Sequence, residues 1–156
     1  MGKTYTKRRG SATLAIFFAA AVLLLVVAAG AQDSSKQEIY KARLSPIPID
    51  LSMMARIAGS GSLTATLSGK QLTITGTFEG LRSPATTAGI HRAPKGIPGV
   101  AVAGLDLIVT KAAKGAISGT LELSPDQIAD LRSGKLYVQI ESERAPEGNL
   151  WGWLLQ

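Results

Sequence analysis

A stretch of twenty residues without a charged side chain, Ala12 to Ala31, divides the chain into unequal parts. A helix rises about 1.5 Å per residue, so such a stretch forms a helix of about 30 Å, the thickness of the hydrocarbon core of a bilayer. A basic tail at 1–11 precedes the stretch, and a polar linker at 32–38 leads to residues 39–156. The stretch therefore limits the globular part of the chain to one domain of modest size.

Two interpretations of this apolar stretch remain open and are nearly balanced. A cleaved secretory signal would use the A-x-A site formed by Ala29 and Ala31. A retained signal anchor would span the membrane once, and the length favours it because the apolar core of a signal usually runs about 7–15 residues. We take the transmembrane signal anchor at 12–31 as the working hypothesis. Small residues would then allow close packing against other membrane helices: Ala15, Ala19, Ala20 and Ala21.

The basic residues beside the apolar stretch predict its orientation. Lys7, Arg8 and Arg9 precede it, and such clusters stay in the cytoplasm by the positive-inside rule. We therefore predict a single-pass protein of the bacterial inner membrane, with a cytoplasmic N-terminus and a periplasmic C-terminal domain.

Charge and cysteine content narrow the function classes. Four of the 17 basic residues precede the apolar stretch and all 11 acidic residues follow it, so the exported part is nearly neutral. A nearly neutral domain gives no reason to expect a nucleic-acid partner. The chain has no cysteine, which excludes disulfides, thiol catalysis and thiolate metal sites. The partners we predict are the lipid bilayer and other subunits of a membrane complex.

Alternation of apolar and polar residues predicts a β domain. The clearest hairpin joins SLTATL at 62–67 to QLTITGTFE at 71–79 through Ser68, Gly69 and Lys70. We expect further strands at 38–44, 86–92, 100–111, 116–123, 135–142 and 150–156, with a turn at 143–149. Many short strands separated by Gly/Pro turns predict an all-β antiparallel sandwich, Greek-key or barrel-like, with about seven or eight strands.

One short helix is expected at 124–134. Ser124 is a favourable N-cap, Pro125 suits the first helical position, and Gln127 completes a capping box. Gly134 provides the stop. The segment 50–57 fits either a helical turn or an edge strand.

The order of these segments resembles the CHRD domain family, named after chordin and found also in bacterial exported proteins. The resemblance covers most of 39–156, and its most specific part is the helix followed by SGKLYVQI. The other matching motifs are ARLSP from Ala42, FEGL at 78–81, AGIH at 88–91 and APEGNLWGWL at 145–154. The resemblance implies a sandwich-like β-fold and no particular activity. Relatives usually show H-I-H where this chain has Gly89-Ile90-His91, and a histidine where it has Glu141, so an inherited metal or ligand function is not expected.

No group of residues predicts catalysis or metal binding. His91 is the only histidine, and a metal centre needs several converging ligands. Glu141, Glu143 and Glu147 cluster near the last turn, but calcium needs about six oxygen ligands, and Arg144 lies among them. We expect a solvated turn there, and we predict no cofactor, no metal and no enzymatic activity.

Trp151 and Trp153 are the most distinctive pair. Residues two apart in a strand point to one face, so both indoles face outward if Leu150 and Leu154 face the core. Two exposed indoles would suit a protein interface or the headgroup layer, and we predict this. The alternative register would place both indoles in the core.

These observations lead to a functional hypothesis. We expect a non-enzymatic, membrane-anchored periplasmic accessory or structural subunit of a larger membrane complex, for which a respiratory or photosynthetic assembly is a natural host. The alternative is a cleaved, soluble, secreted CHRD-type binding module. An enzyme with an unrecognised site ranks last.

Overall fold

The computed structural model describes residues 1–4, 36–47 and 50–156. The predicted signal anchor lies outside the described residues, as do its flanking and packing residues Lys7, Arg8, Arg9, Ala15, Ala19, Ala20, Ala21, Ala29 and Ala31. Within the described ranges, no helix is long and apolar enough to cross a membrane. The domain described below lies within the unit Asp33–Gln156.

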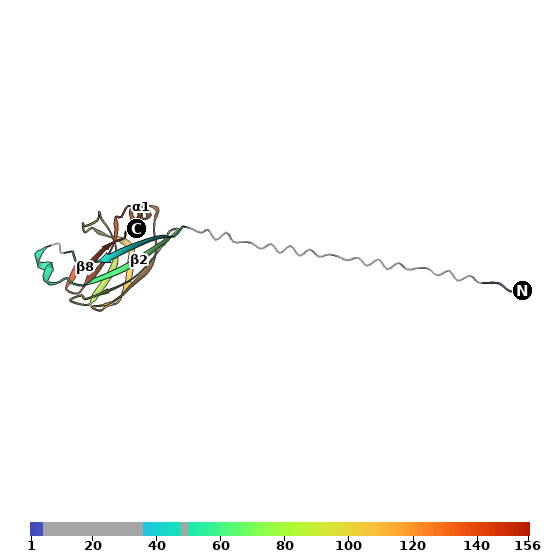
Figure 1. Cartoon of the computed structure of the whole chain (residues 1–156), viewed down its shortest axis with the longest axis horizontal. Coiled ribbons are helices and arrows are strands. Elements are labelled where there is room, and N and C mark those ends of the chain that lie inside the picture. Colours follow the sequence, from blue (N-terminus) through green and yellow to red (C-terminus); the bar gives the residue numbers. More distant parts are fainter. Residues whose placement is uncertain (5–35, 48–49) are drawn as a thin grey trace. The chain divides into compact units, whose positions relative to one another are not determined.

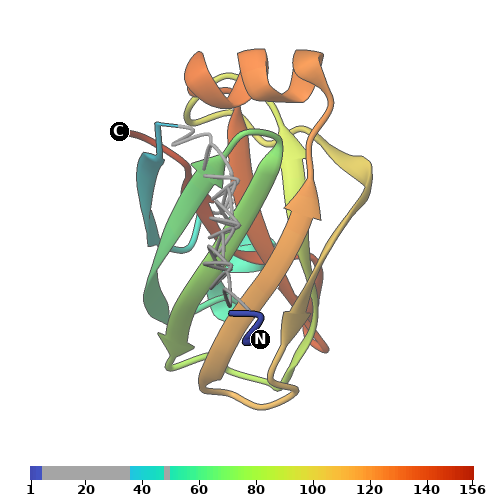
Figure 2. The same cartoon turned by 90° about the vertical axis from the view of Figure 1, so that its right-hand side faces the viewer.

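Eight antiparallel strands form one sheet that curls into an almost closed barrel (Figures 1 and 2). The strand order is β1-β2-β3-β6-β5-β4-β7-β8. Two isolated antiparallel bridges join the first and last strands, Lys41 with Leu155 and Ser45 with Trp151. The strands are β1 Glu38–Leu44, β2 Ser60–Ser68, β3 Gln71–Glu79, β4 Ala85–Arg92, β5 Val100–Val109, β6 Gly115–Glu122, β7 Leu136–Ser142 and β8 Ala145–Trp153. The predicted all-β antiparallel class and its barrel-like form are confirmed.

The predicted hairpin of β2 and β3 is present, and its turn is one residue shorter than expected because Ser68 pairs with Gln71. Leu67 pairs with Leu72 across the two strands, and the turn lies at Gly69 and Lys70. Gly69 has a φ of 61°, a left-handed conformation that glycine adopts without steric cost. The inward side chains of β2 are the predicted ones, because Leu63, Ala65 and Leu67 are all buried.

The last strand begins earlier than the sequence predicts. We expected a turn over 143–149, but β8 starts at Ala145 and the turn is confined to Glu143 and Arg144. The pairing of β7 with β8 is irregular between Ile140 and Ser142, which accommodates extra residues of β8. A bulge of this kind lets a strand continue through residues that otherwise end one, here a Pro and a Gly.

The two helical segments follow local sequence signals. Helix α1 (Pro125–Arg132) has the predicted capping box, in which Ser124 Oγ accepts from Gln127 N at 3.2 Å and Gln127 Oε1 accepts from Ser124 N at 2.8 Å. The ambiguous segment forms a 3₁₀ helix, η1 (Leu51–Ala55). Asp50 caps η1, because its carboxylate accepts from Met53 N at 3.0 Å.

The two helices mark opposite ends of the barrel. Helix α1 lies across the end where β1 begins, and Arg132 of α1 forms an ion pair with Glu38 at 2.5 Å (Figure 2). The segment 93–99 lies at this α1 end too, since Ala93 N donates to Lys135 O. The η1 end carries the turn after β7, because Arg56 donates to Arg144 O.

Apolar side chains form two layers. The main core fills the barrel, and a second cluster lies on its outer side over β7 and β8, so that nearly every residue of these two strands is buried. The members of this outer cluster are Met53, Ile57, Ala93, Tyr137, Ala145, Trp151 and Trp153.

Candidate binding surface

The two tryptophans are buried, so the prediction that they are exposed at an interface is wrong. Trp151 is 1% exposed and Trp153 is 7% exposed. The register that we favoured is correct, because Leu150 and Leu154 belong to the main core and the indoles lie on the opposite face of β8. The predicted exposure is wrong because η1 and the segment 93–99 cover that face of β8. Met53, Ile57 and Ala93 pack into the same cluster as the indoles.

An aromatic stack holds the segment 93–99, which we call the Lys95 loop. The ring centroids of His91 and Tyr137 are 5.3 Å apart, and those of Tyr137 and Trp153 are 4.6 Å apart. The Tyr137 hydroxyl accepts from Gly99 N at 2.8 Å and donates to Gly99 O at 3.2 Å, while Trp153 Nε1 donates to Ala93 O at 3.3 Å. Both ends of the loop are therefore tied to the outer cluster.

The single histidine belongs to this stack. Its Nδ1 lies 3.3 Å from Gly99 O, and its side chain is 8% exposed. Burial raises the pKa of Tyr137, so its hydroxyl keeps the proton that it donates to Gly99. The polar atoms of His91 and Tyr137 therefore contact the backbone of the Lys95 loop at Gly99, and these contacts hold the loop in one conformation.

Beside the loop, a hollow of about 350 Å³ follows the seam between β1 and β8. We call it the tryptophan hollow, because both indoles line it. Three cations also line it: Lys41 and Arg43 of β1 and Lys95 of the loop. Its remaining lining residues are Ser45, Ile47, Gly96 and Leu155, so no carboxylate is among them. Of the ion pairs within the described part of the chain, none involves these three cations.

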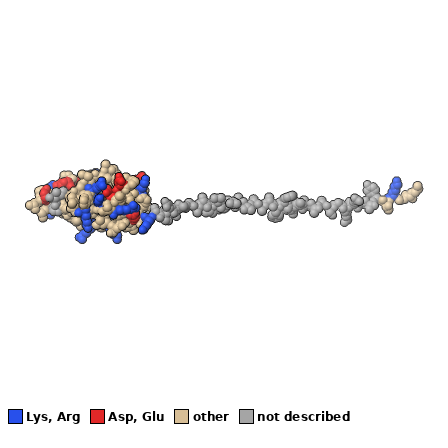
Figure 3. Space-filling view, turned by 90° about the horizontal axis from the view of Figure 1, so that it is seen from above, with Lys and Arg blue, Asp and Glu red and all other residues tan. Residues whose placement is uncertain are grey.

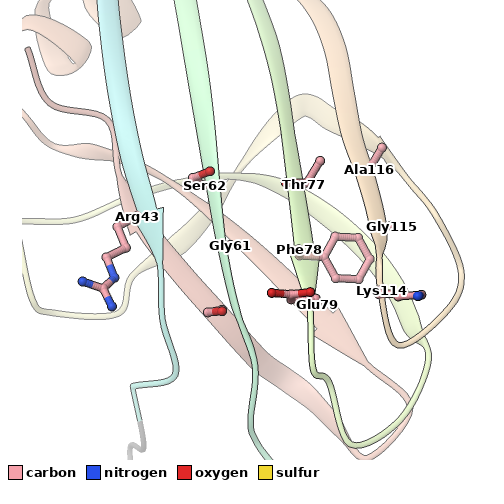
Figure 4. A pocket seen from close by; sticks show the side chains of 10 residues that line it. Arg43, Gly61, Ser62, Thr77, Phe78, Glu79, Lys114, Gly115 and Ala116 are labelled. Carbon is pink, nitrogen blue, oxygen red and sulfur yellow. The ribbon is translucent and has the colours of Figure 1, made fainter.

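A second and larger concavity, a groove, lies over β1, β2, β3 and β6. Figure 4 shows Arg43 at one side of this groove and Lys114 at the other, with Ser62 and Thr77 between them. Ser62 pairs with Thr77, and Thr64 with Thr75, so exposed hydroxyls stand side by side across β2 and β3. Arg43 lines both the groove and the hollow, so the two lie next to each other at β1.

Two of the three carboxylates near the last turn have separate partners. Glu147 forms an ion pair with Arg56 at 2.6 Å, and Glu141 accepts from the Thr87 hydroxyl. Glu143 is exposed. Over the described ranges, no group of three or more His, Asp or Glu side chains converges as a metal site. The ion pair between Glu147 and Arg56 joins β8 to the end of η1, so this carboxylate stabilises the local fold.

The order of strands, the capped helix and the closing strand agree with one family. A family model described as the CHRD domain matches residues 42–154. The chain belongs to the CHRD family. Among curated proteins and among solved structures, no significant match was found. The matched span of this CHRD domain runs from the middle of β1 to the residue after β8, and it contains both tryptophans and the whole Lys95 loop.

Sequence reasoning missed the cations of the hollow. Lys41 and Arg43 alternate with Tyr40, Ala42 and Leu44, so the strand pattern does place them on the outer face of β1. Nothing in the pattern shows that β8 and the Lys95 loop lie beside them. Both signs of charge are interspersed over the domain surface in Figure 3, so a local excess of cations emerges only from the lining of the hollow.

Proposed function

We propose that this CHRD domain is a non-enzymatic binding module, held at the periplasmic face of the bacterial inner membrane by a helix over 12–31. The tail at 1–11 would remain in the cytoplasm. The domain serves as an accessory or structural subunit of a larger membrane complex. The apolar stretch supports the anchoring, and the tryptophan hollow is the observation that carries the binding role.

The hollow fits an acidic segment of a partner subunit. Lys41, Arg43 and Lys95 surround it without a carboxylate, so an incoming carboxylate gains three opposite charges and displaces no internal ion pair. Charge complementarity of this kind directs partner choice and speeds association. The aromatic stack holds the Lys95 loop in place, so binding needs little ordering of the chain.

The alternative function is a soluble, secreted binding module. The A-x-A site at Ala29 and Ala31 favours it, because cleavage there would release the domain with its hollow intact. Both functions use the same binding surface and differ in whether the apolar stretch is retained.

The test is extraction of native membranes in mild detergent, followed by the mass of the particle and of the chain itself. A full-length chain in fixed stoichiometry with larger proteins is expected. A chain that begins at Gln32 and carries no partner would refute the anchored subunit and favour the secreted module.

Charge reversal tests the hollow in the same experiment. The double variant Lys41→Glu and Arg43→Glu should release the domain from its partner, because it replaces two of the three attracting charges. The matched control is Lys111→Glu with Arg144→Glu, two exposed cations outside the hollow and the groove. Equal retention of both double variants would exclude the hollow as the docking site.

A further inference from the structure

We propose that the α1 end of the barrel rests on the membrane surface, where the Lys95 loop inserts Ile97 among the headgroups of anionic phospholipids. This inference rests on the proposed anchoring and adds an orientation to it. The part of the tryptophan hollow beside Lys41 and Arg43, together with the η1 end, is then left for protein partners.

The point where the chain enters the barrel supports this orientation. Strand β1 begins at Glu38, and the ion pair with Arg132 holds that residue at the α1 end. The seven residues from Gln32 to Glu38 reach at most about 25 Å even when fully extended. An anchor that ends at Ala31 therefore keeps the α1 end near the bilayer. Strands β2 and β3 have nine residues each, and they carry the η1 end up to about 30 Å farther away.

The α1 end presents apolar side chains to the surroundings. Ile97 is 57% exposed in the Lys95 loop, and Val100 is 76% exposed where β5 begins beside Arg92. Ile39, at the start of β1, is 54% exposed. Because the aromatic stack fixes the loop at Ala93 and Gly99, Ile97 is presented without a further loss of backbone freedom.

The charge at this end has the sign that anionic headgroups attract. The acidic residues Glu38 and Asp130 are neutralised by Arg132 and Arg92. Glu122 and Asp126 are the other carboxylates near this end, and they have no ion pair within the described chain. Four exposed lysines outnumber them: Lys36, Lys70, Lys95 and Lys135. Lysines held close to an anionic leaflet are attracted within about a Debye length of its surface.

Exposed apolar residues alone do not select the α1 end. Leu51 and Met54 of η1 are 86% and 58% exposed, so the far end of the barrel is equally apolar. The entry point of the chain decides between the two ends. Met54 therefore provides a matched control for Ile97, with nearly the same exposure at the opposite end.

The chain has no cysteine, so a single Ile97→Cys or Met54→Cys substitution gives one labelling site in the full-length protein. Each variant is labelled with a polarity-sensitive fluorophore and reconstituted into phosphatidylcholine vesicles with or without phosphatidylglycerol. The probe at position 97 should shift to shorter wavelength and be quenched by lipids that carry a nitroxide at the headgroup. The probe at position 54 should show neither change, and the effect at 97 should be larger with phosphatidylglycerol.

Two failures are distinguishable. If alkaline carbonate washes the chain from the vesicles, the anchored function and this proposal are both overturned. If the chain stays in the vesicles and the two probes are equally exposed to water, the lipid contact alone is overturned. Charge reversal by Lys95→Glu with Lys135→Glu should reduce the shift at position 97, whereas Lys111→Glu with Lys114→Glu at the η1 end should leave it unchanged.

Discussion

The two buried tryptophans should respond differently to the same substitution. Trp151→Phe and Trp153→Phe remove the same atoms from one cluster, so their packing losses should be similar, about 1–2 kcal/mol. Their Nε1–H groups differ. That of Trp153 donates to Ala93 O, whereas that of Trp151 is buried and has no hydrogen-bond partner among the residues that the structure describes.

This difference in hydrogen bonding determines how much each substitution should change the free energy of unfolding. Losing the bond to Ala93 adds about 0.5–1.5 kcal/mol to the cost of Trp153→Phe, and removing a buried unpaired donor recovers about 1–3 kcal/mol for Trp151→Phe. Trp151→Phe should therefore be close to neutral, and the Trp153 variant should be less stable than it by about 2–4 kcal/mol.

Urea unfolding of residues 33–156 measures both free energies, because each variant retains the other tryptophan as its fluorescent reporter. The slope of unfolding free energy against urea should stay that of the unsubstituted domain, which confirms that both variants unfold the same surface. A Trp151→Phe cost equal to or greater than that of Trp153→Phe would refute the reasoning from the unpaired N–H group.

Four further substitutions test local features of the fold. Hydrogen bonds from Arg132 and Tyr40 lower the pKa of Glu38 from 4.5 to about 2. The ionised Glu38 therefore stabilises the folded domain above pH 4.5, and this stabilisation is lost as the pH falls towards 2. In the Glu38→Gln variant, the melting temperature should therefore change less between pH 4.5 and pH 2 than it does in the unsubstituted domain. Gly148 has a φ of 127° and a Cβ there would overlap the Trp151 ring, so Gly148→Ala should cost more than about 3 kcal/mol in urea unfolding. Gly69→Ala, in open space at a φ of 61°, should cost about 1–2 kcal/mol. Ser124→Ala removes the N-cap of α1 and should lower the unfolding free energy by about 1 kcal/mol.

The sequence by itself determined the elements whose signals are local. Alternation placed Leu63, Ala65 and Leu67 inward on β2, and the Ser124–Gln127 capping box set the start of α1. These features depend on the two-residue period of a strand and on contacts within one turn of helix, which a linear sequence contains in full. The family resemblance was also readable from the motifs along the chain, and the match over 42–154 confirmed it.

Only the tertiary structure decided what covers each face. The alternation gave the correct side of β8 for Trp151 and Trp153, but η1 and the Lys95 loop, which bury them, are separated from β8 by about fifty residues or more along the chain. The same holds for the tryptophan hollow, since Lys41 meets Leu155 only because the sheet closes on itself. Periodicity tells which way a side chain points, whereas exposure and charge clustering depend on distant segments brought together by the packing of the whole barrel.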